Sequence, residues 1–259
     1  GPQVGNALLR NELASTIVPE LPLGVLVAST AGWIGYMIQQ SLQNGLSHAG
    51  VERQVVTQIT QVVVDPAAAE TGEPTKFIGR GLTPDQAGQL RGESWLVTED
   101  PNGVTRRVVP SPIPLEIVER ETIRGLVDRG VIVIAVGGGG TPVYRHPELG
   151  LEGIDAVVDK DRAAALLGSA IGADSMLILT DVDAVYRDYG SAGATRIDRL
   201  TIGEAQRLLD SGELGQGSMR PKVQAATSFL RDGGERAVIA RLDQGLEALA
   251  GTTGTEIVR

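Results

Sequence analysis

The regular alternation of apolar β-branched runs with helical patterns constrains the fold of this chain most strongly. The runs "RGVIVIAVGGGG", "DSMLILTDVDAVY", "RAVIA" and "GTEIV" have the composition of buried strands. Between them lie segments with apolar residues at helical spacing, among them "DKDRAAALLGSAIG", "LDQGLEALAG" and "PKVQAATSFLRDGG", the last ending at paired glycines. This alternation predicts an α/β fold in which a parallel or mostly parallel sheet is covered by helices on both faces.

Two further helices are predicted from local signals. Thr201 and Glu204 have the spacing of a capping box, which places a helix start there and its end near Gly212. The segment "PLEIVERETIRGLVDRG" puts apolar residues on one helical stripe, with charged residues opposite: Ile117, Ile123 and Leu126.

The middle of the chain differs in composition, being rich in Pro, Gly, Thr and Asp. The stretch "DPNGV" is typical of a turn, and it separates two predicted strands, "SWLVTE" and "TRRVV". We interpret residues 66–109 as a small protruding subdomain, inserted into a core made of residues 1–65 and 110–259.

Charge and composition exclude several classes of function. The net charge is -9 and the pI is about 4.8, without any basic run, so the chain is not expected to bind nucleic acid. The absence of cysteine excludes disulfides, Cys-zinc sites and thiol nucleophiles. Only two histidines are present, which argues against a metal cluster built on His.

Residues 21–50 contain no charged side chain and resemble a membrane span at first sight. Four amides and frequent Gly and Ser interrupt the segment, whereas a span needs about 20 mostly apolar residues. We therefore expect a buried or subunit-packing helix whose apolar residues include Trp33, Met37, Ile38 and Leu42. The opening residues also lack the apolar core of a signal peptide. We expect a cytoplasmic protein with no membrane attachment.

Three segments follow predicted strands, where the ligands of open parallel sheets bind. They are the four glycines Gly137–Gly140, the stretch "TDVDAVY" and the loop "GQGSMRPK". Glycines allow phosphate to approach the backbone closely, although a tight packed turn explains four glycines equally well. The P-loop and dinucleotide-binding signatures, the nucleophile elbow and the zinc-protease motif are all absent from the sequence.

Lysine is scarce in this chain: Lys76, Lys160 and Lys222 are the only three, and every other cationic side chain is arginine. A lysine is a movable point charge that can follow a migrating phosphoryl group, whose transfer depends on alignment and charge neutralisation. Lys160 and Lys222 lie at predicted helix starts, where a cation opposes the helix dipole. The alternative is that three lysines survive by chance, that Asp161 is an ordinary helix acid, and that Asp181 and Asp183 belong to a turn.

The motifs together resemble the carbamate kinases of the amino acid kinase superfamily. The resemblance runs along the chain through "GPQVG", "TQITQVVVDP", "PTKFIG", "RRVVPSPIPLEIVE", "VVDKDRAAALL", "LILTDVDAVY", "GSMRPKVQAA" and "TGTEIV". It implies a three-layer αβα fold around a mainly parallel sheet, and a homodimer. It also implies reversible phosphoryl transfer between ATP and carbamate, giving ADP and carbamoyl phosphate.

The resemblance also implies roles for individual residues. Asp161 would orient lysines beside the phosphoryl group. Lys222 would neutralise the transferring phosphate and contact the nucleotide, Lys160 would line the same site, and Lys76 would reach over the carbamate from the protruding subdomain. Gly1 would lie beside the substrate, and Mg²⁺ would be held mainly by phosphate oxygens rather than by a protein cage. The nucleotide would contact Gly137, Gly138, Gly139, Asp181, Asp183, Tyr186, Met219 and Pro221.

The sequence departs from the family pattern in places. It begins at the "GPQVG" motif, so the family's first strand, phosphate-binding loop, helix and second strand are not part of it. Phe77, Arg80 and Arg220 are unusual for the family, and Arg220 would add charge beside the phosphate. Two alternatives follow: another kinase of the superfamily that makes a different acyl phosphate, against which "PTK" argues, or a truncated remnant that dimerises without catalysis.

Overall fold

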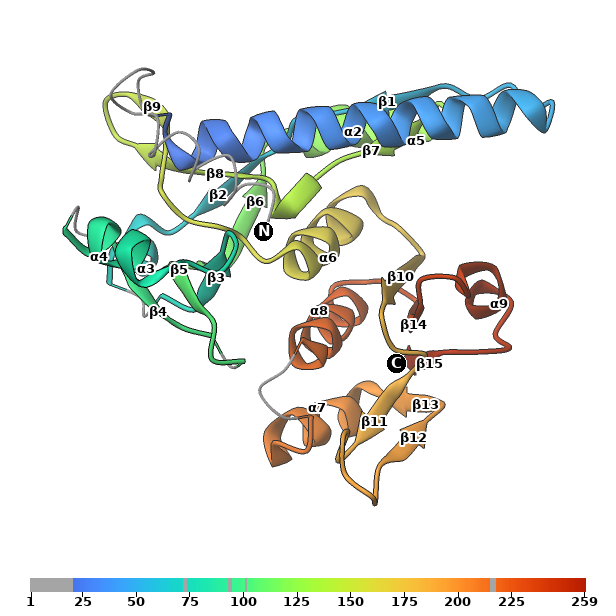
Figure 1. Cartoon of the computed structure of the whole chain (residues 1–259). Helices are drawn as coiled ribbons and strands as arrows, with labels where there is room; N and C mark the ends of the chain where they lie inside the picture. The colour runs from blue at the N-terminus through green and yellow to red at the C-terminus, as the bar shows by residue number, and fades with distance from the viewer. Residues whose placement is uncertain (1–20, 72–73, 93–94, 101, 215–217) are drawn as a thin grey trace. The chain divides into compact units, whose positions relative to one another are not determined.

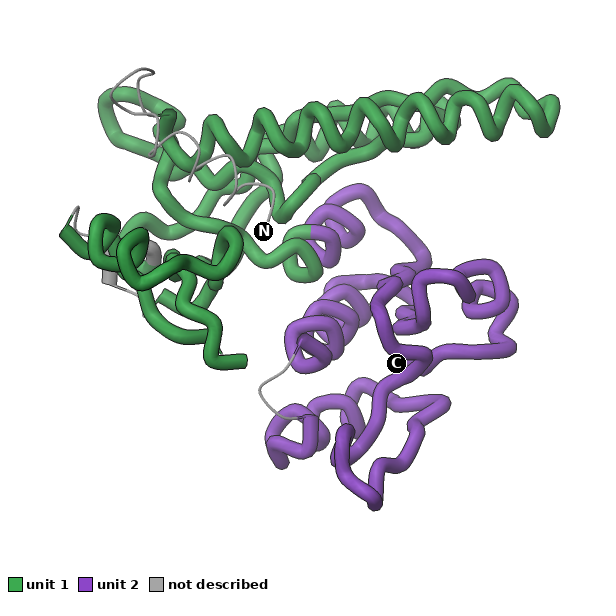
Figure 2. Tube along the Cα trace, viewed as in Figure 1, with its two compact units in different colours: residues 1–163 green, residues 164–259 purple. Residues whose placement is uncertain are grey.

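The computed structural model describes residues 21–71, 74–92, 95–100, 102–214 and 218–259. The chain divides into two compact units, residues 1–163 and residues 164–259 (Figure 2). Each unit is described by itself below.

Unit 1 opens with a long helix that lies along a strand. Helix α2 (Leu23–His48) contacts β1 (Val55–Thr57), and β1 pairs in parallel with β7 (Ile132–Ile134), next to α5 (Arg120–Asp128) (Figure 1). The contact is close at Gly35, because a Cβ there would lie 2.3 Å from Cγ2 of Thr57. Glycine at this position therefore lets helix and strand approach.

A second sheet of unit 1 has the strand order β6-β2-β8-β9. Its strands are β2 (Gln61–Val64), β6 (Pro114–Ile117), β8 (Thr141–His146) and β9 (Gly150–Gly153). Strands β2 and β8 are parallel, whereas β6 and β9 add to them in antiparallel direction. Ile117 belongs to β6, so its predicted place on a helical stripe was wrong. The charged pattern that suggested a helix holds only from Arg120 onward, because pairing with β2 extends the preceding residues.

Residues 66–109 form a small sheet with two helices. The elements are α3 (Pro66–Thr71), β3 (Lys76–Ile78), α4 (Pro84–Gly92), β4 (Val97–Glu99) and β5 (Thr105–Val109). The strand order is β3-β5-β4 and both pairings are antiparallel. The predicted turn between β4 and β5 is confirmed: Gly103 has a φ of +74° and its N–H donates to the carbonyl of Asp100.

This small sheet is attached to the rest of unit 1 by apolar packing. Ile78 of β3 and Val109 of β5 share a buried cluster with residues of α2 and with the segment before α6, namely Leu23, Leu26, Val27 and Val157. Trp95, which is itself partly buried, packs against the same cluster. The position of β3 is therefore fixed by the hydrophobic effect.

Unit 2 is built on a sheet of order β10-β14-β15-β13. The strands are β10 (Ser175–Thr180), β13 (Arg199–Thr201), β14 (Arg236–Arg241) and β15 (Thr255–Val258). The pairs β10/β14 and β13/β15 are parallel, and β14/β15 is antiparallel. A separate hairpin joins β11 (Val185–Arg187) to β12 (Thr195–Ile197).

The helices of unit 2 are α7 (Ile202–Ser211), α8 (Met219–Arg231) and α9 (Gly245–Leu249), and α6 (Lys160–Ile171) leads into the unit. The capping box of α7 is confirmed in both directions, and Gly212 ends the helix with a φ of +78°. The paired glycines after α8 are explained as well. Gly233 has a φ of +123°, and a Cβ on Gly234 would lie 2.2 Å from the buried Phe229 ring.

The predicted α/β class is confirmed. In each unit, parallel strand pairs are combined with antiparallel pairs, and helices accompany the strands. Within the described residues, no helix combines the length and apolar character needed to cross a membrane.

Candidate functional site

The glycine run after β7 forms a tight turn, and its members have different surroundings. A Cβ on Gly139 would lie 2.1 Å from the carbonyl oxygen of Val158, and one on Gly140 would lie 2.4 Å from Cγ2 of Val62. These two glycines are packing positions. A Cβ on Gly138 would meet nothing within 4 Å, yet its φ is +68°. Gly138 is therefore the member of the run that a ligand can approach.

Backbone strain precedes this turn at Val136, whose φ of +47° lies in the left-handed region. A β-branched residue rarely adopts this conformation, and such strain costs on the order of 1–3 kcal/mol. The buried Thr60 maintains it: its hydroxyl accepts a hydrogen bond of 3.0 Å from the N–H of Val136, and its carbonyl accepts one of 2.8 Å from Thr141. Strain held by buried contacts is characteristic of ligand-binding turns.

The turn before α6 uses one carboxylate for two purposes. Asp159 Oδ1 accepts hydrogen bonds from the N–H groups of Asp161 and Arg162, at 3.0 and 3.3 Å, and so caps the helix. Its other oxygen, Oδ2, accepts a hydrogen bond of 2.9 Å from Nζ of Lys76. The sequence analysis did not select Asp159, because its contact with Lys76, 83 residues away, leaves no local signal in the sequence.

Asp161 occupies the first turn of the same helix and is buried. Its Oδ2 lies 3.3 Å from Nζ of Lys160, whose side chain is 60% exposed. The resemblance gave Asp161 the role of orienting lysines. In unit 1, Asp159 binds Lys76 and Asp161 pairs with Lys160, and the role of Asp161 stays a prediction. Unit 1 thus brings two predicted lysines and two carboxylates to one helix start.

Burial by itself would raise the pKa of Asp159. The charge of Lys76 and its hydrogen bond, helped by the N–H of Arg162 and the charge of Lys160, outweigh this effect and lower the pKa below its ordinary value. Asp159 is therefore ionised at neutral pH, and this corner of unit 1 holds fixed charges of both signs.

In unit 2, polar groups gather where the parallel strands β10 and β14 end. The hydroxyl of Thr180 donates to Asp181 at 3.0 Å, and the guanidinium of Arg241 donates to Asp243 at 2.7 and 3.2 Å. The hydrogen bond between them lowers the pKa of Asp243 and raises that of Arg241. The sequence analysis did not single out Arg241 and Asp243, although "RLD" directly follows the predicted strand "RAVIA".

Tyr186 and Asp183 form a second polar group in unit 2. The phenolic hydroxyl donates to both carboxylate oxygens of Asp183, at 3.0 and 3.3 Å, and this hydrogen bond raises the pKa of Tyr186. Arg196 lies 3.8 Å from the same carboxylate, and the ring of Tyr189 lies 5.7 Å from that of Tyr186. The hairpin β11/β12 therefore presents two aromatic rings beside a carboxylate.

The start of α8 holds the remaining predicted residues. Lys222 lies in the first turns of the helix and is only 5% exposed, while Met219 packs against the apolar core of unit 2 and Pro221 is half-buried. Arg220, expected to add charge beside the phosphate, donates to the carbonyl of Leu209 at 2.6 Å. Leu209 lies in the last turn of α7, where a cation is favourable.

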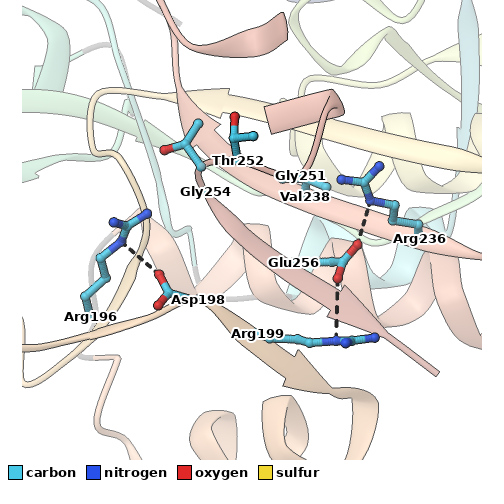
Figure 3. A pocket seen from close by; sticks show the side chains of 10 residues that line it. Arg196, Asp198, Arg199, Arg236, Val238, Gly251, Thr252, Gly254 and Glu256 are labelled. Carbon is cyan, nitrogen blue, oxygen red and sulfur yellow. Dashed lines mark ion pairs between the residues drawn. The ribbon is translucent and has the colours of Figure 1, made fainter. Parts of the chain in front are cut away.

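Figure 3 shows a pocket of about 430 Å³ in unit 2, lined by three arginines, two carboxylates and the loop before β15. Glu256 lies between Arg236 and Arg199, at 2.7 and 3.5 Å, and Asp198 pairs with Arg196 at 3.2 Å. The pocket contains none of the residues predicted for the site. Its cations face carboxylates of the same pocket, so its charges are largely compensated.

Two further predictions concern Gly1 and the metal ion. Gly1 lies outside the described residues. Among the residues described, no group of three His, Asp or Glu side chains is arranged to hold a metal ion.

Comparisons with known proteins place the chain in a family. Residues 11–241 match the model of the amino acid kinase family. The carbamate kinase of Pyrococcus horikoshii is 44% identical over 260 residues, which cover 99% of this chain and 82% of that protein. The carbamate kinase of Halobacterium salinarum is 45% identical over 262 residues, or 100% of this chain and 82% of the relative.

Solved structures agree with these relatives. The carbamate kinase from Giardia lamblia bound to AMP-PNP superposes with a TM-score of 0.89 at 38% identity, covering 100% of this chain and 82% of that one. The same enzyme bound to citric acid gives a TM-score of 0.90 at 38% identity, with the same coverage. Because the family model spans most of the sequence and these similarities extend along all of it, the chain belongs to the amino acid kinase family.

Proposed function

We propose that this protein is a phosphotransferase that catalyses the carbamate kinase reaction, the reversible transfer of a phosphoryl group between ATP and carbamate. The observation that carries the proposal is the similarity, above 40% identity and along the entire chain, to carbamate kinases of two distant organisms. The two lysine–aspartate pairs at the start of α6 supply the charged groups that such chemistry requires.

In this mechanism the protein acts by holding charged side chains around the transferred phosphoryl group. Lys222 neutralises the transferring phosphoryl group, Lys160 lines the same site, and Lys76 reaches over the carbamate. The N–H groups of the turn at Gly138 receive the phosphoryl oxygens. We expect Lys222 to contact the nucleotide as well. The convergence of the three lysines stays a prediction, as do their individual roles.

Unit 2 would bind the nucleotide. The AMP-PNP bound to the Giardia lamblia enzyme supports the use of ATP and ADP. Asp181, Asp183 and Tyr186 follow β10, at the sheet edge where nucleotides bind in α/β proteins. Mg²⁺ would arrive with the nucleotide as part of the substrate and be ligated mainly by phosphate oxygens. Met219 and Pro221 would contribute contacts at the start of α8.

The test is ATP formation from ADP, Mg²⁺ and carbamoyl phosphate by the full-length protein. We expect turnover on the order of 1–100 s⁻¹, the range of typical kinases. A parallel assay offers ATP with glutamate or aspartate and traps any acyl phosphate as a hydroxamate. Turnover of an amino acid without turnover of carbamoyl phosphate would favour another kinase of the superfamily. If the protein turns over neither carbamoyl phosphate nor an amino acid, the proposal is contradicted.

We also propose a homodimer, formed through the exposed apolar residues of α2. Large side chains that are 39–60% exposed follow one another along this helix: Trp33, Tyr36, Met37, Ile38 and Leu42. Exposed apolar patches of this kind mark protein–protein contacts. Sedimentation of the double variant Trp33→Glu, Met37→Glu is expected to show a monomer, whereas a double variant in the exposed 48–52 turn, His48→Glu with Val51→Glu, remains dimeric. The cytoplasmic location stays a prediction of the sequence.

A further inference from the structure

Asp159 joins two segments that are far apart in the sequence. One of its oxygens caps α6, and the other holds Lys76, which is 83 residues away on β3. The Asp159 side chain is 11% exposed and that of Lys76 is 32% exposed. The contact is therefore not one of the solvated surface pairs that contribute almost nothing to stability.

A purely structural role for this pair does not fit its surroundings. Lys76 and Ile78 lie on the same face of β3, because side chains alternate along a strand. Ile78 is 2% exposed and already anchors the strand in the apolar cluster with Leu23 and Val109. Apolar residues in place of a largely buried ion pair are often neutral or stabilising. Stability alone therefore gives no reason for a charged pair at this position.

The neighbouring pair of Lys160 and Asp161 shows what the contact between Lys76 and Asp159 adds. Lys160 sits on the same turn, its carboxylate partner lies at the longer distance of 3.3 Å, and its side chain is 60% exposed. Lys76 is held at 2.9 Å by a carboxylate whose own orientation is fixed by two backbone N–H groups. One lysine can therefore move with a ligand, and the other is held in place before a ligand arrives.

We propose that Asp159 is a positioning residue, which holds the ammonium group of Lys76 at the start of α6 so that it is in place when carbamoyl phosphate binds. Without Asp159, the lysine side chain would have to be ordered at each binding event, which weakens binding of this substrate. The contact in unit 1 stands independently, but its contribution to the reaction rests on the proposed function.

The first test uses the scarcity of lysine and needs no activity. The folded protein is treated briefly with acetic anhydride, and acetylation of Lys76, Lys160 and Lys222 is followed separately by mass spectrometry. An ammonium held by a carboxylate must leave it and lose its proton before it reacts. We expect Asp159→Asn to accelerate acetylation of Lys76 about tenfold, on the scale of one charge-assisted hydrogen bond. Acetylation of Lys160 should change less than about twofold.

Two variants separate the ion pair from other effects. Asn is as good a helix cap as Asp, so Asp159→Asn removes the charge and keeps the cap, whereas Asp159→Ala removes both. Asp159→Ala should show the same acceleration and a lower melting temperature than Asp159→Asn. Asp85→Asn removes an exposed acid from the same subdomain and should leave Lys76 acetylation unchanged. An unchanged rate at Lys76 in Asp159→Asn would overturn the proposal.

The second test is kinetic. In Asp159→Asn we expect KM for carbamoyl phosphate to rise about tenfold, KM for ADP to stay constant and kcat to change less than about threefold, because the bound lysine makes the same transition-state contacts. A fall in kcat as large as that of Lys76→Ala, with KM unchanged, would contradict a positioning role. If even the wild type fails to turn over carbamoyl phosphate, the proposed function fails, and the acetylation rates still decide whether Asp159 holds Lys76.

Discussion

The polar groups of unit 1 and those of unit 2 are held in different ways. In unit 1, the glycine turn is closed by buried contacts, Val136 is strained, and the carboxylates of Asp159 and Asp161 are about nine-tenths buried. In unit 2, Arg241 and Asp243 bind each other in solvent, with 47% and 68% of their side chains exposed. Rigid placement suits groups that act on a transferring phosphoryl unit, whereas exposed pairs can rearrange around a bound nucleotide.

Lys222 provides the strongest test of this comparison. It belongs to unit 2, but unlike the exposed pair of that unit it is buried, with only 5% of its surface exposed. If it acts on the migrating phosphoryl group, Lys222→Ala should lower kcat by at least about 100-fold, the scale of losing one preorganised charge. Lys222→Arg should also be impaired, because a planar guanidinium cannot replace a compact ammonium.

The control for Lys222 is a folding measurement, since truncating a buried residue can unfold a protein. Far-ultraviolet circular dichroism of both variants must match the wild type before kcat is compared. A folded Lys222→Ala variant with near-wild-type turnover would remove the lysine from the mechanism. Full activity of Lys222→Arg would instead refute the argument from lysine scarcity.

The glycine turn gives a matched pair of substitutions within unit 1. In Gly139→Ala the new methyl group collides with the backbone carbonyl of Val158, and the φ of +104° is unsuitable for alanine, so we expect a loss of about 3 kcal/mol in stability. In Gly138→Ala the space is free, and only the φ of +68° opposes the change, at about 1–2 kcal/mol.

Both tryptophans of the chain, Trp33 and Trp95, lie in unit 1, so their fluorescence during urea unfolding reports on this unit. The order of the two midpoints is the decisive result. If Gly138→Ala proves the more destabilising variant, the assignment of Gly139 to packing and Gly138 to the ligand side is incorrect. If both substitutions are harmless, the turn is less rigid than its contacts indicate.

The sequence was sufficient for features that depend on local signals. The capping box at Thr201, the glycine stop after α8 and the α/β class follow from spacing and composition, and they are confirmed. Ile117 was misassigned because its apolar spacing suits a helix, while pairing with β2, distant in sequence, makes it part of a strand. Local pattern cannot reveal such a partner.

The candidate site residues show the same difference between local signals and contacts with distant parts of the chain. The scarcity of lysine in the sequence pointed to Lys76 and Lys160, and in unit 1 both lie beside carboxylates at the start of α6. Asp159 was missed because no local signal in the sequence reveals its contact with Lys76 of β3. The expected place of Arg220 beside the phosphate stays a prediction, and its guanidinium donates to a carbonyl at the end of α7. Composition identifies unusual residues, but only the fold identifies their partners.

The smallest predicted effect belongs to the partly exposed pair of Tyr186 and Asp183 in unit 2. The hydroxyl of Tyr186, which is protonated near neutral pH like that of any tyrosine, donates a hydrogen bond to Asp183, and this bond raises its pKa further. Because a solvent-accessible bond of this kind contributes about 0.5–1 kcal/mol, Tyr186→Phe should raise KM for ADP by roughly two- to fivefold. Tyr189→Phe, which keeps that bond, is the control. A loss of kcat in Tyr186→Phe comparable to that of Lys222→Ala would mean that unit 2 also holds its groups rigidly for chemistry, and the contrast between the two units would no longer stand.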